Sequence, residues 1–168
     1  MSRGFVKEDD QEEVPMVPPR AHLPAGVPNY VTQAGMDELL AERQAMMNEK
    51  ENLEISSENE RRIAVNHIKA KLQLLSNRIT EARIIVLEEQ PKDEIRFGAT
   101  ITLKTEGTED IQNFQIVGVD EADISRGKIS FLSPLARVLT NKKAGDKVVL
   151  KRPKGDRIFI IMDITYIE

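Results

Sequence analysis

The stretch 32–88 contains no proline, and this constrains the fold more than any other feature of the sequence. Apolar residues in its second half recur at alternating spacings of three and four residues, which is the a/d pattern of a helical seam. This seam consists of Val65, Ile68, Leu72, Leu75, Ile79 and Ala82. A first helix is predicted over 33–54, because Thr32 is a suitable N-cap and apolar residues follow on one side.

A polar break divides the two predicted helices. It covers residues 55–60, and Ser57 followed by Glu60 fits a capping box at the start of the second helix. Two helices with facing seams and a short break predict an antiparallel hairpin with its tip near 55–60. Arms of this length would project roughly 33–42 Å at 1.5 Å per residue. The outer faces are charged, so the hairpin is expected to stand out in solvent rather than fold back onto the remaining chain.

Residues 89–168 change to the period of β-strands. Ser133 and Pro134 fit the N-cap and the first position of one short helix that ends at Leu139. The chain is therefore expected to be α+β, with a helical segment followed by an antiparallel β domain that carries one short helix. The predicted strands are separated by glycines that signal turns, and they cover 97–104, 114–119, 128–132, 147–151 and 157–166.

The N-terminal stretch 1–31 has a third composition. It holds five of the eight prolines and an acidic run over 8–13, and both features oppose compact folding. A mostly disordered tail is predicted, either without a specific partner or with Phe5 and Val6 as a short docking motif. The expected domains are therefore 1–31, 32–88 and 89–168.

Charge and composition exclude several classes of function. The 24 Lys+Arg against 28 Asp+Glu give a net charge of -4, which argues against a stand-alone nucleic-acid binder. The absence of cysteine excludes disulfides, thiolate zinc sites and a cysteine nucleophile, and two isolated histidines argue against a histidine metal site. No apolar run approaches the roughly 18 residues of a membrane span. A cytoplasmic protein without catalytic machinery of its own is expected.

Two groups of acidic residues are candidate sites. Glu54, Glu58 and Glu60 lie at the predicted tip, where they either complete a metal site owned by a partner or simply form a polar turn. The acidic stretch 120–123 follows a predicted strand, and a turn that exposes acids to a basic partner is favoured over a cation site, since too few ligands are present. No stable metal site and no cofactor are expected.

Four motifs follow one another in the C-terminal half of the chain. They read IVGVDEAD at 116–123, GKIS at 127–130, SPLARVL at 133–139 and KKAGDKV at 142–148. Earlier, Tyr30, Val31, Thr32 and Gly35 form the expected start of the first helix. In this order the motifs resemble the Gre family (GreA/GreB) of bacterial transcription elongation factors, and the resemblance covers about 30–168. It implies an N-terminal antiparallel coiled coil followed by an FKBP-like domain.

The resemblance implies an accessory factor and not an enzyme. Family members dock on bacterial RNA polymerase at the secondary channel, and their tip helps hold magnesium at the polymerase active centre, so that a backtracked transcript is cleaved. Glu58 is the implied residue that shares this magnesium, with Glu54 and Glu60 as further candidates. A monomer is expected, which meets nucleic acid indirectly through the elongation complex and has no membrane partner. The implied docking residues are Asp120, Glu121, Asp123, Ser133, Pro134, Leu135 and Arg137.

The tip departs from the family pattern. Ile55 stands where the family has an aspartate, and Arg62 stands where it has a tyrosine. The arms are about two turns shorter, which would withdraw the tip by roughly 11 Å. One alternative is therefore a channel-binding inhibitor or competitor of Gre factors without cleavage activity. A further alternative is a prolyl isomerase, an activity of some FKBP-like folds that requires an apolar, aromatic-lined pocket.

Overall fold

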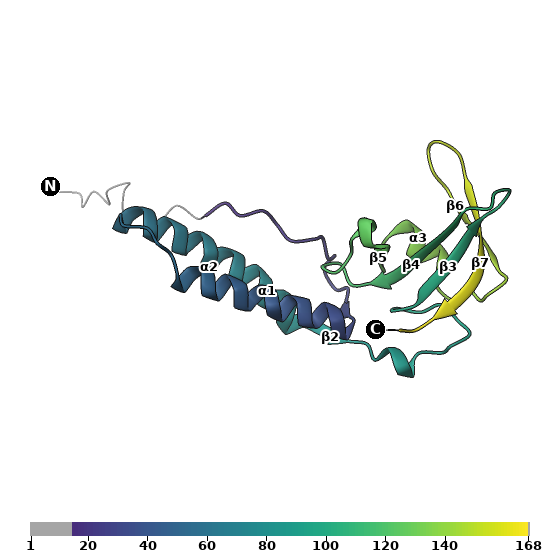
Figure 1. The fold of residues 1–168 in the computed structure, drawn as a ribbon, viewed down its shortest axis with the longest axis horizontal. Coiled ribbons are helices and arrows are strands. Elements are labelled where there is room, and N and C mark those ends of the chain that lie inside the picture. The colour runs from purple at the N-terminus through teal and green to yellow at the C-terminus, as the bar shows by residue number, and fades with distance from the viewer. Residues whose placement is uncertain (1–14, 168) are drawn as a thin grey trace.

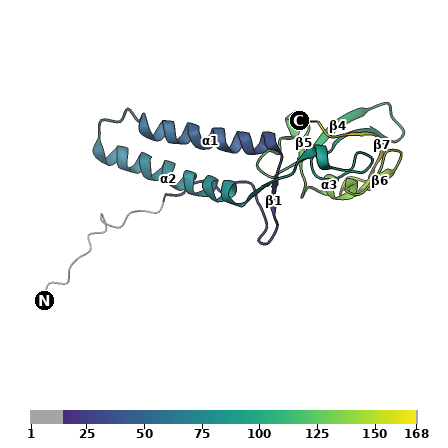
Figure 2. The same ribbon diagram turned by 90° about the horizontal axis from the view of Figure 1, so that it is seen from below.

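The computed structural model of the protein describes residues 15–167. Helix α1 (Gln33–Glu51) and helix α2 (Glu58–Glu81) lie side by side and are called the helix pair. Figure 1 shows the helix pair extending away from a twisted sheet, with the connection 52–57 at its far end. Seen from below in Figure 2, the two helices again run alongside one another, so the molecule is elongated.

Both helices begin at the N-caps that the sequence predicts. The Thr32 side chain accepts a hydrogen bond from the Gly35 amide at 2.9 Å, and the Ser57 side chain accepts one from the Glu60 amide at 3.4 Å. Such bonds satisfy amides of the first turn that have no partner within the helix. The caps therefore fix where each helix starts.

Helix α1 ends at Glu51, three residues before the predicted end at 54. Asn52 forms its C-cap, and both the backbone amide and the side-chain amide of Asn52 donate to the carbonyl of Asn48. The side chain thus adds a second hydrogen bond to a carbonyl in the last turn, where the helix ends. Of the predicted seam, Ile68 and Leu75 are buried.

Two short strands join the N-terminal segment to the end of α2. Strand β1 (Asn29–Val31) pairs in parallel with β2 (Ala82–Ile84), and the Asn29 side chain donates to the Arg78 carbonyl at 3.0 Å. Sequence patterns predict disorder through residue 31, and this is wrong for the strand β1. Residues 1–14 of the predicted tail, which include Phe5 and Val6, lie outside the described residues.

The remaining strands form a single sheet in the order β5-β4-β3-β7-β6. Neighbours are antiparallel except β4 and β5, so the prediction of an antiparallel domain is wrong for this pair. A parallel pair needs a crossover connection, and here the connection contains the 3-10 helix η3 (Ile124–Arg126). The five strands are β3 (Thr100–Thr105), β4 (Ile111–Val117), β5 (Lys128–Ser130), β6 (Lys147–Leu150) and β7 (Arg157–Thr165).

The sheet carries the main core. Helix α3 (Pro134–Leu139) contacts β5 and β6, and a second 3-10 helix, η2 (Leu87–Glu89), lies in the connection from the helix pair. We call residues 90–166 the sheet unit. Its buried members include Ile95, Ile101, Leu103, Ile116, Leu139 and Ile161.

The helix pair has a much smaller core of its own, built on Val31, Leu39 and Leu75. Because so little apolar surface is buried there, the position of the helix pair depends on its contacts with the rest of the chain. Among residues 15–167, no helix is both long enough and apolar enough to cross a membrane.

Candidate functional sites at the helix tip and the junction

The connection between α1 and α2 presents the acidic residues that the sequence places at the tip. Glu54 lies in the connection, whereas Glu58 and Glu60 lie in the first turn of α2, and all three are exposed. Carboxylates in a first turn are favoured by the partial positive charge of the helix N-terminus. The tip therefore offers carboxylates to solvent at the end of the helix pair that is farthest from the sheet (Figure 1).

Two arginines make contacts within the tip. Arg61 donates to the carbonyl of Leu53 at 3.3 Å, and Arg62 donates to the side-chain oxygen of Asn59 at 3.0 Å. Within residues 15–167, no three or more acidic or histidine side chains are grouped so as to hold a metal ion.

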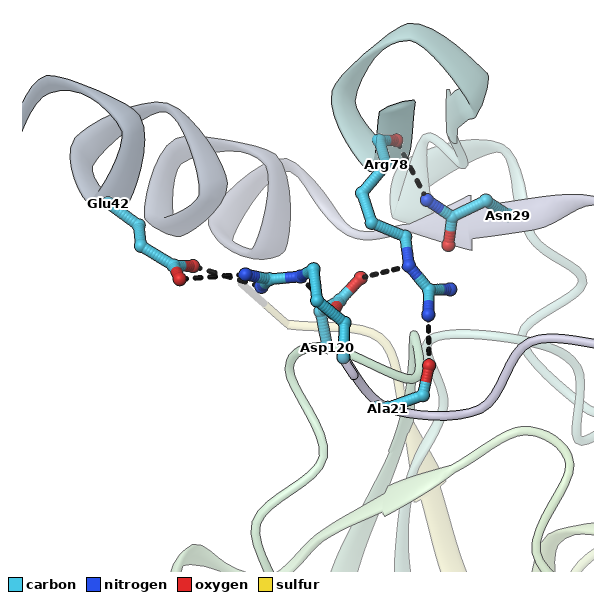
Figure 3. A network of polar contacts seen from close by, with 6 residues as sticks. Ala21, Asn29, Glu42, Arg78 and Asp120 are labelled. Carbon is cyan, nitrogen blue, oxygen red and sulfur yellow. Dashed lines mark hydrogen bonds and ion pairs between the residues drawn. The ribbon is translucent and has the colours of Figure 1, made fainter. Parts of the chain in front are cut away.

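At the opposite end of the helix pair, Asp120 lies at the centre of a charged network (Figure 3). Arg20 Nε donates to Asp120 Oδ1 at 3.1 Å, and Arg78 Nε lies 3.7 Å from Asp120 Oδ2. The other two nitrogens of Arg20 donate to the Glu42 carboxylate at 2.8 and 3.0 Å, and these bonds raise the pKa of Arg20. Arg78 also donates to the carbonyl of Ala21.

Glu121 makes a second buried contact at this junction. Its side chain is 3% exposed, its Oε1 accepts a hydrogen bond from the Thr32 hydroxyl at 2.5 Å, and Lys128 Nζ lies 3.0 Å from its Oε2. Because Thr32 caps α1, Glu121 fixes the start of that helix against the sheet unit. A Cβ on Gly35 would lie 2.5 Å from Glu121 Oε1, so glycine permits this close approach.

Aromatic rings add an apolar contact at the junction. The ring of Tyr30, in β1, lies 5.8 Å from that of Phe97 and 5.6 Å from that of Phe131, measured between centroids. Phe97 and Phe131 are also 5.6 Å apart in an edge-to-face arrangement, a favourable geometry for aromatic pairs. The junction thus combines a buried charged network with an aromatic cluster.

The predicted docking residues next to β4 are not equivalent. Asp120 and Glu121 are buried in the junction, so the expectation that this turn exposes them to a basic partner is wrong. Asp123 instead caps η3, and hydrogen bonds from Ser125 lower the pKa of Asp123. Of these three acids, Asp123 is the one that a partner could reach.

The other predicted docking residues belong to α3 and its cap. Ser133 accepts a hydrogen bond from the Ala136 amide at 3.3 Å, and Leu135 packs against the core of the sheet unit. Pro134 and Arg137 are exposed. Contact with a partner is therefore open to Pro134 and Arg137, whereas Ser133 and Leu135 hold the helix in place.

Sequence patterns do not reveal Arg20, Arg78 and Glu42 as partners of Asp120. Arg20 and Asp120 are separated by 100 residues, and no local motif connects such positions. One weak signal exists, because Arg20 is the single lysine or arginine between Lys7 and Arg43 and lies in a proline-rich stretch with few charges.

Comparison with known proteins relates the chain to transcription factors. The family model "Transcription elongation factor, GreA/GreB, C-term" matches residues 90–166. The transcription elongation factor GreA of Francisella philomiragia subsp. philomiragia is 37% identical over 130 residues, which cover 77% of this chain and 79% of that protein. The GreA of Maricaulis maris is 36% identical over 116 residues, which cover 69% of this chain and 72% of that protein.

Solved structures of the same group are also similar. The crystal structure of GreA factor homolog 1 of Thermus thermophilus is 24% identical, covers 81% of this chain and 97% of that chain, and has a TM-score of 0.40. The GreA/GreB factor of Nitrosomonas europaea is 18% identical, covers 83% of this chain and 99% of that chain, and has a TM-score of 0.42.

The sequence relatives define a class of accessory transcription proteins. The chain belongs to the GreA/GreB family of transcription elongation factors. Membership makes it an accessory factor and not an enzyme itself, which argues against the prolyl isomerase alternative.

Proposed function

We propose that the chain binds bacterial RNA polymerase at the secondary channel and modulates elongation by promoting cleavage of backtracked transcripts. In this proposal the helix pair is an antiparallel coiled coil that enters the channel, and the sheet unit is an FKBP-like domain that docks at its rim. The proposal is supported by family membership together with the position of the exposed acids at the end of the helix pair.

The single observation that carries the proposal is the distance between the acids and the body of the protein. Helix α2 has 24 residues, and Glu58 is the first of them. At 1.5 Å per residue, the helix places Glu58 about 36 Å from its other end. A carboxylate on so long a projection can be delivered into a site that belongs to a larger partner.

The chemistry of magnesium fits this role. Mg²⁺ keeps several of its waters and is commonly held by one or two carboxylates together with phosphate oxygens. One or two tip acids can therefore complete a coordination sphere that the polymerase and transcript begin, with Glu58 first and Glu54 and Glu60 as further candidates. The bound ion supplies the activation of water for phosphodiester cleavage, and nucleic acid is met indirectly through the elongation complex.

Docking of the sheet unit would use its exposed positions. Pro134 and Arg137 are exposed on α3, and Asp123 caps the neighbouring η3. Asp120 and Glu121 contribute by holding the helix pair against the sheet unit, since both are buried at the junction.

Backtracked complexes of bacterial core polymerase test the proposal with the full chain. We expect the wild type to shorten the transcript and Glu58→Ala to lower the cleavage rate by about tenfold or more, the scale of losing support for a catalytic metal. Glu88→Ala is the matched control, because Glu88 is exposed on η2, away from the tip. Equal cleavage with Glu58→Ala would remove Glu58 from the mechanism, and failure of the wild type to bind polymerase would refute the whole proposal.

A second candidate is a competitor that occupies the channel without promoting cleavage. It is favoured by Ile55 in the tip connection and by the Arg62–Asn59 contact, which places a cation beside the first turn of α2. Addition of the chain to a reaction that contains a cleavage-competent Gre factor distinguishes the two candidates. A competitor lowers the cleavage rate in proportion to its concentration, whereas a cleavage factor maintains or raises it.

A further inference from the structure

The leader, residues 15–28, reaches the junction between the helix pair and the sheet unit. It passes beside α2 and then continues into β1, which Figure 2 labels. The leader precedes the residues that the family model matches, which begin at 90. The family model therefore does not describe the contacts of the leader.

We propose that Arg20 is a positioning residue, which joins α1 to the sheet unit and thereby fixes the direction in which the helix pair projects. The guanidinium group holds carboxylates from two different parts of the fold. Nη1 and Nη2 donate to Glu42 of α1 at 2.8 and 3.0 Å, and Nε donates to Asp120 beside β4 at 3.1 Å. A bidentate contact fixes orientation as well as distance.

Asp120 depends on this contact for its hydrogen bonding. Its side chain is 7% exposed, and Oδ2 has no hydrogen-bond partner among the described residues, although Arg78 Nε lies 3.7 Å away. The hydrogen bond to the buried carboxylate of Asp120 therefore comes from Arg20 Nε, which donates to Oδ1. Loss of Arg20 would leave a buried charge with one distant partner, which is strongly unfavourable.

The leader also acts on the second helix. Arg78 of α2 donates to the carbonyl of Ala21, the residue that follows Arg20 (Figure 3). The leader segment at 20–21 consequently contacts α1, α2 and the sheet unit together. These contacts join the helix pair to the sheet unit in addition to the continuous chain at 82–89.

Because the helix pair is long, a small change in its direction relative to the sheet unit displaces the tip by a large distance. Helix α2 has 24 residues, so a rotation of about 10° at the junction would move the tip by about 6 Å at 1.5 Å of rise per residue. Such a displacement exceeds what metal coordination tolerates. The effect on transcript cleavage rests on the proposed function, whereas the effect on the orientation of the helix pair does not.

Distance measurements between spin labels test the role of Arg20 in the full chain. The sequence has no cysteine, so Lys69→Cys and Gln112→Cys provide unique labelling sites on exposed positions of α2 and β4. We expect a narrow distance distribution by electron–electron double resonance in the wild-type background. Arg20→Ala should shift or broaden it by several ångströms, and Arg20→Lys should be intermediate, because lysine lacks the planar fork.

A second substitution keeps the test decisive if Arg20→Ala disturbs folding. Glu42→Gln weakens the ionic contact between Arg20 and α1 while leaving Arg20 beside Asp120. Glu51→Gln is its control, because Glu51 is the exposed last residue of the same helix. We expect Glu42→Gln to broaden the distribution and Glu51→Gln to leave it unchanged. A distribution that stays at its wild-type mean and width in both Arg20→Ala and Glu42→Gln would overturn the proposal.

Polymerase assays separate this inference from the proposed function. Arg20→Ala should retain polymerase binding through the sheet unit and lose cleavage activity. If the wild type does not bind polymerase, the proposed function fails, while the spin-label distances still decide the role of Arg20.

Discussion

Glu121 shows how one buried carboxylate positions a helix. It accepts from the hydroxyl that caps α1 and pairs with Lys128 of the sheet unit. Glu121→Ala should lower the free energy of unfolding by about 3 kcal/mol, the scale of breaking a buried ion pair, because Lys128 loses its partner and Thr32 its acceptor. Urea unfolding followed by circular dichroism measures this loss.

An exposed acid provides the comparison for Glu121. The Glu109 side chain is 95% exposed and lies 3.5 Å from Lys104. Glu109→Ala should change the free energy of unfolding by less than about 0.5 kcal/mol, as solvent screens such surface pairs. Similar losses in both variants would show that the junction contact of Glu121 contributes little.

The burial of Asp120 and Glu121 could not be predicted from the sequence. The motif that contains Asp120 and Glu121 is visible in the sequence, and a turn after a strand is ordinarily exposed. Their partners Arg20 and Thr32 lie 100 and 89 residues away. Burial of this turn follows from packing between distant segments, and local residue patterns carry no information about such packing.

At the scale of elements, the strongest local signals are confirmed. The caps at Ser57 and Ser133 and the five strands of the sheet occur near the predicted positions. Strands β1 and β2 were not predictable, because each has three residues and their pairing joins segments about fifty positions apart. The parallel pairing of β4 and β5 was also not predictable from local patterns. The direction of a strand depends on the crossover connection and not on the alternation of side chains.

Gly118, the residue after β4, permits a close approach to the backbone of strand β1. A Cβ at this position would lie 2.5 Å from the backbone oxygen of Tyr30. Gly118→Ala should therefore force the strands apart and lower the free energy of unfolding by about 2 kcal/mol, within the range for overpacking. Thermal unfolding measures the loss directly.

Gly35→Ala is the informative comparison for this prediction. Its Cβ would contact the side chain of Glu121, not backbone, and alanine in place of glycine favours the helix by up to about 1 kcal/mol. The loss in Gly35→Ala should therefore be smaller than in Gly118→Ala. A larger loss in Gly35→Ala would show that the backbone contact at Gly118 relaxes easily.

At the scale of the whole molecule, two unequal cores are joined by one junction. The sheet unit has a continuous buried core, whereas the helix pair buries Val31, Leu39 and Leu75 with partly buried neighbours. A core this small cannot offset the conformational entropy of ordering two long helices. The helix pair should therefore unfold together with the sheet unit, through contacts that sequence patterns do not show.

Tyr30 tests this coupling, because its ring joins β1 to Phe97 and Phe131 of the sheet unit. We expect the wild type to unfold in one transition, with equal calorimetric and van't Hoff enthalpies. Tyr30→Ala should lower the free energy of unfolding by about 3 kcal/mol. It should also divide the unfolding into two transitions, in which the helices unfold first and the sheet unfolds later. Phe114→Ala, which removes a partly buried ring that packs against the core of the sheet unit, should lower the melting temperature and keep one transition. If Tyr30→Ala also unfolds in one transition, other contacts couple the two parts.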